Sequence, residues 1–181
     1  MKRVISFFKR KDLYLGLTRY ALSLWMLPYA ISKILQVQFR FDPATLQQLS
    51  ASELTGKQLT WLFLGHSTWF EILLGFFELI PAVLLVFRRT TLLGAVLMLP
   101  MTLNVLLINF AFQLWDGTKQ IAVFLFTLNC LILIFEWRRI RFMWQLALQK
   151  SVVTKYPAVE WIINIVFLAG MILYITVILL K

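Results

Sequence analysis

The sequence has little of the side-chain chemistry on which redox, metal and hydrolytic sites depend. It contains one cysteine, Cys130, and one histidine, His66, in 181 residues. One cysteine cannot form an internal disulfide or a dithiol redox pair, and an isolated histidine is a poor ligand for a metal or a haem. A Ser-His-Asp arrangement, a Gly-rich phosphate loop and a CxxC motif are also absent. We therefore expect no metal site and no catalytic residue, and the sequence favours a role other than that of an enzyme.

Charged residues are scarce too, at 14% of the chain, whereas hydrophobic residues make up 61% and the mean hydropathy is +0.82. A bilayer core about 30 Å thick requires about 20 apolar residues per helix. Five runs of roughly that length are present, at 13–35, 68–87, 92–114, 121–137 and 158–180. We predict an all-α membrane protein with a four-helix transmembrane bundle and one additional C-terminal transmembrane helix.

The apolar runs divide the chain into four parts. We predict a basic cytoplasmic N-terminus at 1–12, a transmembrane bundle at 13–137 with an external loop at 36–67, an amphipathic interfacial segment at 138–156 and a fifth transmembrane helix at 157–181. The first run is longer than a signal-peptide core and lacks a small-x-small cleavage site, so we interpret it as a retained span. Within the external loop, Asp42-Pro43 indicates a turn and a helix start, and residues 59–64 indicate a short helix at the membrane surface.

Basic residues dominate the charge, which is +10 overall, and they are unevenly placed. Twelve of the 18 Lys and Arg residues lie before the first run, between the second and third, or between the fourth and fifth. These segments lie on one side of the membrane, so the positive-inside rule predicts a multi-pass protein of the bacterial inner membrane, with a cytoplasmic N-terminus and a periplasmic C-terminus. The charge then reflects topology and attraction to anionic lipids, and we expect no nucleic-acid partner.

The segment 138–156 alternates basic and apolar residues, which is typical of a helix lying at the lipid surface. Its basic and aromatic side chains form either a lipid-facing surface or a docking surface for a protein partner. The residues concerned are Arg138, Arg139, Arg141 and Trp144. Membrane lipids, other membrane subunits or a second copy of the chain are the partners that we expect.

Several polar residues fall inside the predicted spans, where a charge at the bilayer centre costs about 2.5–3.5 kcal/mol. A rise of about 1.5 Å per residue sorts them into a middle layer and an outer layer. The middle layer holds Arg19, Glu78, Asn104 and Asn129, and the outer layer holds Lys33, Glu71, Asn109 and Lys119, with Tyr29 one turn from Lys33. Gly75 shares a helix face with both glutamates and permits close approach of a neighbouring helix.

Matched depth and opposite charge predict that Glu78 pairs with Arg19, and that Glu71 pairs with Lys33 or Lys119. Two interpretations of the polar layers stay open. The polar groups either hold the bundle in register or line a site for a substrate, a quinone or a lipid.

Several short patterns resemble those of the DoxX-like membrane proteins, especially the Bacteroidetes type. They are Tyr29-x-x-x-Lys33, Gly75-x-x-Glu78, Asn104-Val105, Asn109-Phe110, and Asp116 with Lys119, within residues 13–139. The resemblance implies a four-helix membrane bundle with Lys33, Glu78, Asn104 and Asn109 at motif positions. That family takes its name from a subunit associated with thiosulfate:quinone oxidoreduction. This sequence departs from the pattern at Tyr29-Ala30, where the family has Tyr-Gly, and it has no cysteine pair for a thiol relay.

These observations predict a DoxX-like protein that acts as a non-catalytic subunit or accessory factor of a membrane complex. Its polar bundle would hold a partner or a lipophilic ligand such as a quinone or a lipid, and no other cofactor is expected. Two alternatives remain: a quinone-linked redox component of a membrane enzyme, and a transporter of a small solute or protons that uses Glu78.

Overall fold

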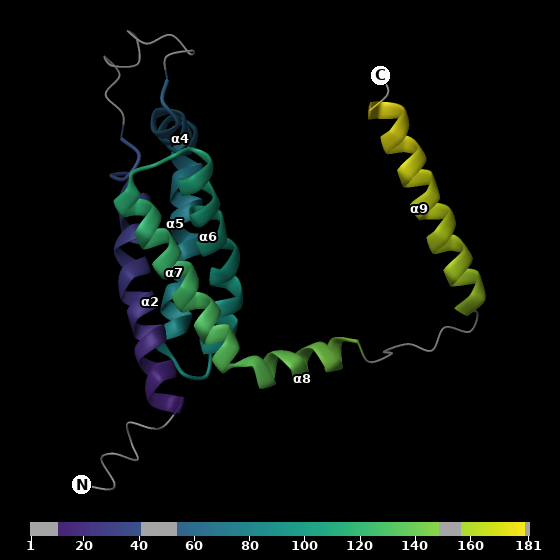
Figure 1. Cartoon of the computed structure of the whole chain (residues 1–181), viewed down its shortest axis with the longest axis horizontal. Coiled ribbons are helices and arrows are strands. Elements are labelled where there is room, and N and C mark those ends of the chain that lie inside the picture. Colours follow the sequence, from purple (N-terminus) through teal and green to yellow (C-terminus); the bar gives the residue numbers. More distant parts are fainter. Residues whose placement is uncertain (1–10, 41–53, 149–156, 180–181) are drawn as a thin grey trace, which may run out of the picture. The chain divides into compact units, whose positions relative to one another are not determined.

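A computed structural model describes residues 11–40, 54–148 and 157–179, and the regular structure in these ranges is entirely helical. The helices are α2 (Lys11–Ile34), α4 (Gly56–Gly65), α5 (Thr68–Val86), α6 (Thr91–Ala111), α7 (Asp116–Phe135), α8 (Trp137–Ala147) and α9 (Pro157–Leu179) (Figure 1). The predicted all-α class is confirmed. The chain divides into two compact units, residues 1–142 and 143–181.

Three of these helices, α5, α6 and α7, are long and apolar enough to cross a membrane. Each lies within a few residues of a predicted run. The largest difference is at the start of α7, because the predicted run begins at residue 121, whereas residues 116–119 already form the first turn of this helix. Asp116 carries a negative charge next to the positive end of the helix dipole, and the Lys119 N–H bonds to the Trp115 carbonyl at 3.0 Å. The reversal between α6 and α7 is therefore shorter than the sequence suggested.

Helices α2, α5, α6 and α7 pack around a common core. Helix α2 contacts α5 and α7, and α6 contacts the same two helices. The connection between α5 and α6 spans only residues 87–90, so these two helices form an antiparallel hairpin. Gly94 brings α6 close to α5, since a Cβ there would lie 2.9 Å from the Leu85 backbone nitrogen and 3.0 Å from the Pro81 carbonyl oxygen.

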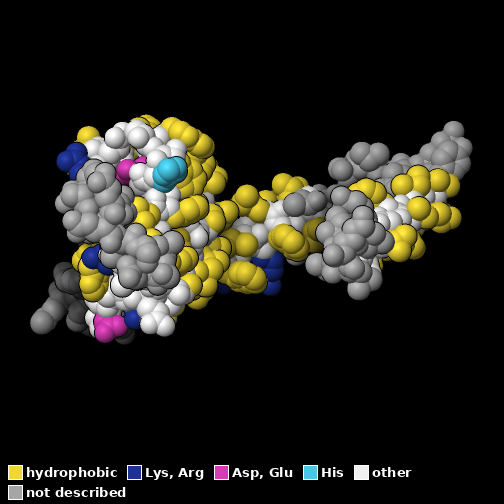
Figure 2. All heavy atoms as spheres, turned by 90° about the horizontal axis from the view of Figure 1, so that it is seen from above, with side chains coloured by type: hydrophobic (Ala, Val, Ile, Leu, Met, Phe, Trp, Pro, Cys, Tyr) yellow, Lys and Arg dark blue, Asp and Glu magenta, His cyan; other side chains and the backbone are white. Residues whose placement is uncertain are grey.

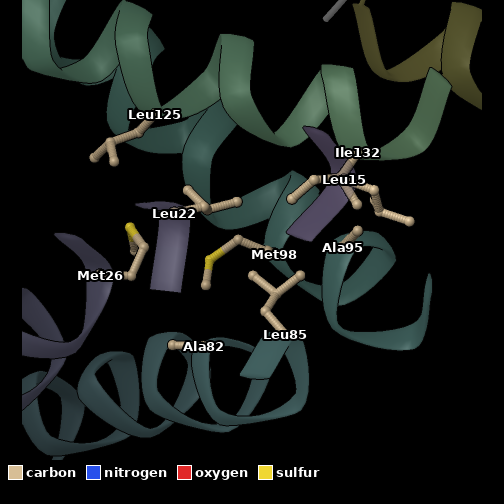
Figure 3. Packing of buried hydrophobic residues seen from close by; sticks show 9 residues of the cluster. All are labelled: Leu15, Leu22, Met26, Ala82, Leu85, Ala95, Met98, Leu125 and Ile132. Carbon is tan, nitrogen blue, oxygen red and sulfur yellow. The ribbon is translucent and has the colours of Figure 1, made fainter. Parts of the chain in front are cut away.

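The core consists of apolar side chains from all four helices. Leu22, Leu85, Met98 and Ile132 are fully buried, and Figure 3 shows them converging with five neighbours. The outer faces of the helices are apolar as well: Leu24 is 71% exposed and Trp69 is 69% exposed. Figure 2 shows hydrophobic side chains gathered along the sides of the bundle. Such a surface would be unfavourable in water and suits contact with lipid.

The bundle has two chemically different ends. The basic end contains the start of α2, the α5–α6 connection and the end of α7. The opposite end, where α2 ends and α5 begins, is covered by α4 and is called the α4 end. Helix α4 matches the short helix predicted near residues 59–64. Thr55 begins α4 with a capping box that Gln58 completes. The turn predicted at Asp42-Pro43 lies outside the described residues.

The predicted interfacial segment 138–156 is helical in its first part, as α8, while residues 149–156 lie outside the described ranges. Trp137 and Phe142 on α8 are exposed. In the second unit, α9 coincides with the predicted fifth run and contains the apolar stretch Trp161–Leu173.

Candidate functional site

A cavity of about 120 Å³ lies inside the bundle near its α4 end. Its wall is mostly apolar and comes from α2, α4, α5, α6, α7 and the segment that follows α2. A small set of polar side chains interrupts this wall: Tyr29, Lys33, Gln38, Thr60, Glu78, Thr102, Asn104, Asn109 and Thr118. An apolar cavity with a few converging polar groups is the usual form of a ligand site.

The strongest polar interaction in this wall joins two helices. Lys33 Nζ on α2 lies 2.5 Å from Glu78 Oε2 on α5, and the two residues are 6% and 4% exposed. Close packing of the helix backbones supports this pair, because a Cβ at Gly75 would lie 2.8 Å from the Ala30 carbonyl oxygen and 2.7 Å from Ile34 Cγ1. The predicted close approach at Gly75 is confirmed.

The predicted pairing of Glu78 with Arg19 is wrong. Side chains on a helix lean toward its N-terminus. Because α2 and α5 are antiparallel, Lys33 leans toward the basic end and Glu78 leans toward the α4 end, so their charged groups meet. Arg19 leans away from Glu78. The prediction compared only the depths of the Cα atoms in the membrane. It took no account of the direction of each side chain or of the length of the lysine side chain, and it therefore gave Glu78 the wrong partner.

Arg19 is instead held by neutral groups. It is 9% exposed and donates hydrogen bonds to Thr91 Oγ1 at 3.2 Å and to the Tyr20 hydroxyl at 3.0 Å. Its guanidinium also lies 4.7 Å from the centre of the Tyr20 ring. Among the described residues, no carboxylate lies within salt-bridge distance of Arg19.

The predicted pairing of Glu71 with Lys33 or Lys119 is also wrong. Lys33 is bound to Glu78, and Lys119 bonds to Asp116 at 3.1 Å in the first turn of α7. Glu71 is 4% exposed, and its Oε1 has no hydrogen-bond partner within the described part of the chain.

The three predicted asparagines have different environments. Asn109 lines the cavity, donates to the Val105 carbonyl at 2.8 Å and leaves its Oδ1 without a partner among the described residues. Asn129 lies behind the cavity wall, where it donates to Thr102 Oγ1 at 3.3 Å. Asn104 lines the cavity, yet it is exposed.

One lining residue of the cavity is exposed. Asn104 is the one exposed residue among the lining residues that the structure describes. Met101 and Ile108 share the face of α6 on which Gly94 packs against α5, and Asn104 lies at the edge of that face. Asn104 is therefore the lining residue that reaches the surface of the bundle, on the side of α6 next to α5.

Helix α4 packs over the cavity and lines it with Thr60, Trp61 and Leu64. The glycines at the two ends of α4 lie against the backbones of Phe112 and Phe39. A Cβ at Gly56 would be 2.3 Å from the Phe112 carbonyl oxygen, and a Cβ at Gly65 would be 2.5 Å from the Phe39 carbonyl oxygen. Trp61 packs edge-on against Phe39, with ring centres 5.5 Å apart, and against Trp115 at 6.0 Å. Lys57 Nζ lies 3.3 Å from the Trp115 ring centre.

Of the nine polar residues predicted for the bundle, the structure brings five to the cavity: Tyr29, Lys33, Glu78, Asn104 and Asn109. Arg19, Glu71, Lys119 and Asn129 lie elsewhere. The sequence had not singled out the lining residues Gln38, Thr60, Trp61, Thr102 and Thr118. The threonines bond to backbone carbonyls three or four residues earlier, at Gly56, Met98 and Trp115, and so give no signal in the sequence. Trp61 was assigned only to a surface helix.

The predicted surface residues of α8 are all exposed. Arg138 and Arg139 line a second cavity at the basic end, and Arg139 bonds to Glu136 at 3.1 Å. Arg141 does not line this cavity, and Trp144 belongs to the second unit.

The chain is 34% identical to a protein of Bacillus subtilis (strain 168) over 111 residues, which are 61% of this chain and 68% of that protein. That relative is the uncharacterized protein YwoB. This chain belongs to the YwoB family. No family model and no solved structure matches the chain. The name of YwoB states no activity.

Proposed function

We propose that the protein is a DoxX-like protein of the bacterial inner membrane, and that its cavity holds the polar head of a lipophilic molecule such as a quinone or a lipid. The Lys33–Glu78 pair on the wall of an otherwise apolar cavity carries this proposal. An ammonium has three donors, and buried hydrogen-bonding groups normally have partners. A ligand carbonyl or hydroxyl near Lys33 would accept a hydrogen bond from its ammonium, and a hydroxyl would in addition donate one to the unpartnered Asn109 Oδ1.

The size of the cavity and the exposure of Asn104 support a ligand that is only partly enclosed. Ordinary small-molecule pockets measure about 300–1,000 Å³, whereas this cavity measures about 120 Å³. It is large enough for a headgroup and too small for a whole lipid. An apolar tail would leave past Asn104 and lie along α5 and α6, whose outer faces are hydrophobic.

We further infer that α2, α5, α6 and α7 form a four-helix transmembrane bundle and that α9 is a fifth span. Helices α2 and α9 contain 24 and 23 residues, or about 35 Å each at 1.5 Å per residue, which is sufficient for a bilayer core. The positive-inside rule places the basic end and the N-terminus in the cytoplasm and the C-terminus in the periplasm.

A non-catalytic role as a subunit or accessory factor fits the surfaces of the second unit and of α8. Trp144, Trp161 and Phe167 are each at least 65% exposed. In a membrane, such aromatic surfaces contact lipid, another subunit or a second copy of the chain. Purification in a mild detergent should retain a stoichiometric partner if the chain is a subunit, and a monodisperse single chain would contradict that role.

Titration with decylubiquinone, a short-tailed quinone, tests the cavity. Trp61 lines the cavity, so binding should quench tryptophan fluorescence saturably in the purified protein. The Lys33→Met variant should lose saturation. The Lys119→Met variant removes a lysine that pairs outside the cavity and should retain saturation. Equal, non-saturating quenching in all three proteins would mean simple partitioning into detergent and would overturn the proposal.

A second candidate is transport of protons or a small solute, which the buried carboxylate of Glu78 favours. Flux into proteoliposomes that disappears in a folded Glu78→Gln variant would support transport. If the wild-type protein shows no flux above that of empty vesicles, transport is excluded.

A further inference from the structure

The basic end of the bundle contains a second cavity that is separate from the proposed headgroup site. Its volume is about 210 Å³, and three parts of the chain form it: the start of α2, the end of the α5–α6 connection nearest α5, and the junction of α7 with α8. Four cations line it, namely Lys11, Arg88, Arg138 and Arg139, with two carboxylates, Asp12 and Glu136.

The carboxylates do not balance the cations. Asp12 is bound to Arg88 at 2.6 Å, and Glu136 is bound to Arg139. Lys11 donates to the carbonyl of Phe135 at the end of α7. Arg138 has no carboxylate within salt-bridge distance among the residues that the structure describes. Lys11 and Arg138 are thus the two cations of the lining that neither lining carboxylate neutralises.

Arg19 adds a further positive charge behind this cavity. Lys11, Leu15 and Arg19 are spaced by four residues and share one face of α2. Leu15 lines the cavity, and Arg19 is buried one turn beyond it, again without a carboxylate partner in the described ranges. A buried cation without a counterion strengthens the positive potential of the site, because the apolar surroundings screen its charge poorly.

We propose that this basic-end cavity binds the phosphate of an anionic phospholipid headgroup. Arginine and lysine side chains are the usual ligands of phosphate, and basic cavities between membrane helices bind anionic headgroups. The site lies where α5 and α7 end, which is the level expected for headgroups. Leu15 and Phe135 supply apolar contacts next to the cations. The lipid is identified by a phosphate with net negative charge, which free phosphate shares and a zwitterionic headgroup lacks, so the test separates these sources.

The test measures thermal unfolding of the full chain in detergent micelles with phosphatidylglycerol, phosphatidylcholine or inorganic phosphate. Phosphatidylglycerol should raise the unfolding midpoint, because a ligand that binds only the folded state stabilises it. Phosphatidylcholine, which has no net charge, should have little effect. A matching rise with millimolar inorganic phosphate would support the phosphate site but assign it to the free anion.

Matched arginine variants identify the site. Arg138→Gln removes the cation that has no carboxylate partner and should weaken the apparent affinity for phosphatidylglycerol about tenfold, the effect of losing one hydrogen bond to a charged group. Arg88→Gln should act in the same direction. Arg141→Gln removes an exposed arginine of the same helix that does not line the cavity, so it should leave the affinity unchanged. An equal loss in Arg141→Gln, or no rise with either phosphate source in the wild type, would overturn the proposal.

Discussion

Lys33 Nζ and Glu78 Oε2 meet 2.5 Å apart across the interface of α2 and α5, and both side chains are shielded from solvent. Removing one member of a buried pair leaves the other charge without compensation, which typically costs about 3–5 kcal/mol. Lys33→Met and Glu78→Gln should each destabilise the protein by about 3 kcal/mol in detergent.

The double variant should be no less stable than either single one, because it leaves no uncompensated charge. Thermal unfolding of the four proteins forms a double-mutant cycle that measures the coupling. Strictly additive losses would show that Lys33 and Glu78 do not act as a pair. The Arg19→Met variant combined with Glu78→Gln should give additive effects, since these two residues do not bond.

The close contact of α2 with α5 at Gly75 gives a second prediction. In Gly75→Ala, the new Cβ would lie 2.8 Å from the Ala30 carbonyl oxygen, so the helices must separate. We expect a loss of about 1–3 kcal/mol, as for other overpacked cores. In Gly16→Ala, on the partner helix α2, the new Cβ meets nothing within 4 Å, so this variant should stabilise the protein slightly, because alanine favours helix over glycine. Similar unfolding midpoints for the two variants would contradict the packing at Gly75.

Helix α4 should act as a fixed cover of the cavity. Thr60 lies on the cavity side of α4 and is 3% exposed. In a Cys130→Ala background, a Thr60→Cys variant should react slowly with a water-soluble maleimide. Adding Gly56→Leu places a side chain against the Phe112 carbonyl oxygen and should displace α4, so that labelling becomes much faster. Rapid labelling without the Gly56 substitution would show that α4 does not close the cavity.

Two glutamines occupy a backbone conformation that glycine favours. Gln36 and Gln113 have φ values of 56° and 47°, just after α2 and α6 end. The following N–H groups bond back to the carbonyls of Ser32 and Asn109, which is the Schellman pattern.

A left-handed residue other than glycine is strained by about 1–2 kcal/mol, and glycine recovers part of that. Gln113→Gly should therefore stabilise the protein by about 0.5–1 kcal/mol. Gln120→Gly, inside α7, makes the same chemical change in a helical conformation and should destabilise it. Chemical denaturation of both variants measures the difference, and destabilisation of similar size in both would contradict the left-handed assignment.

The sequence predicted the helices well because each apolar run is long and is bounded by charged or turn residues. Of the polar residues that it singled out, Lys33, Glu78 and Asn109 lie in the wall of one cavity. It could not predict their partners, since the pairing depends on the lean of each side chain and on the reach of lysine. The exposure of Asn104 and the place of Trp61 in the cavity wall depend on how α4, α5 and α6 pack, which no local pattern encodes.

The most direct test of the proposed headgroup site is extraction of the molecules that copurify with the protein. Wild-type protein and the Lys33→Met, Glu78→Met double variant would be purified in the same detergent and extracted with organic solvent for mass spectrometry. We expect one quinone or lipid species near one molecule per wild-type chain that is lost from the folded double variant, whereas phospholipid held at the basic-end cavity should remain in both. If every extracted species has the same ratio to protein in both, the proposed site at Lys33 and Glu78 is contradicted.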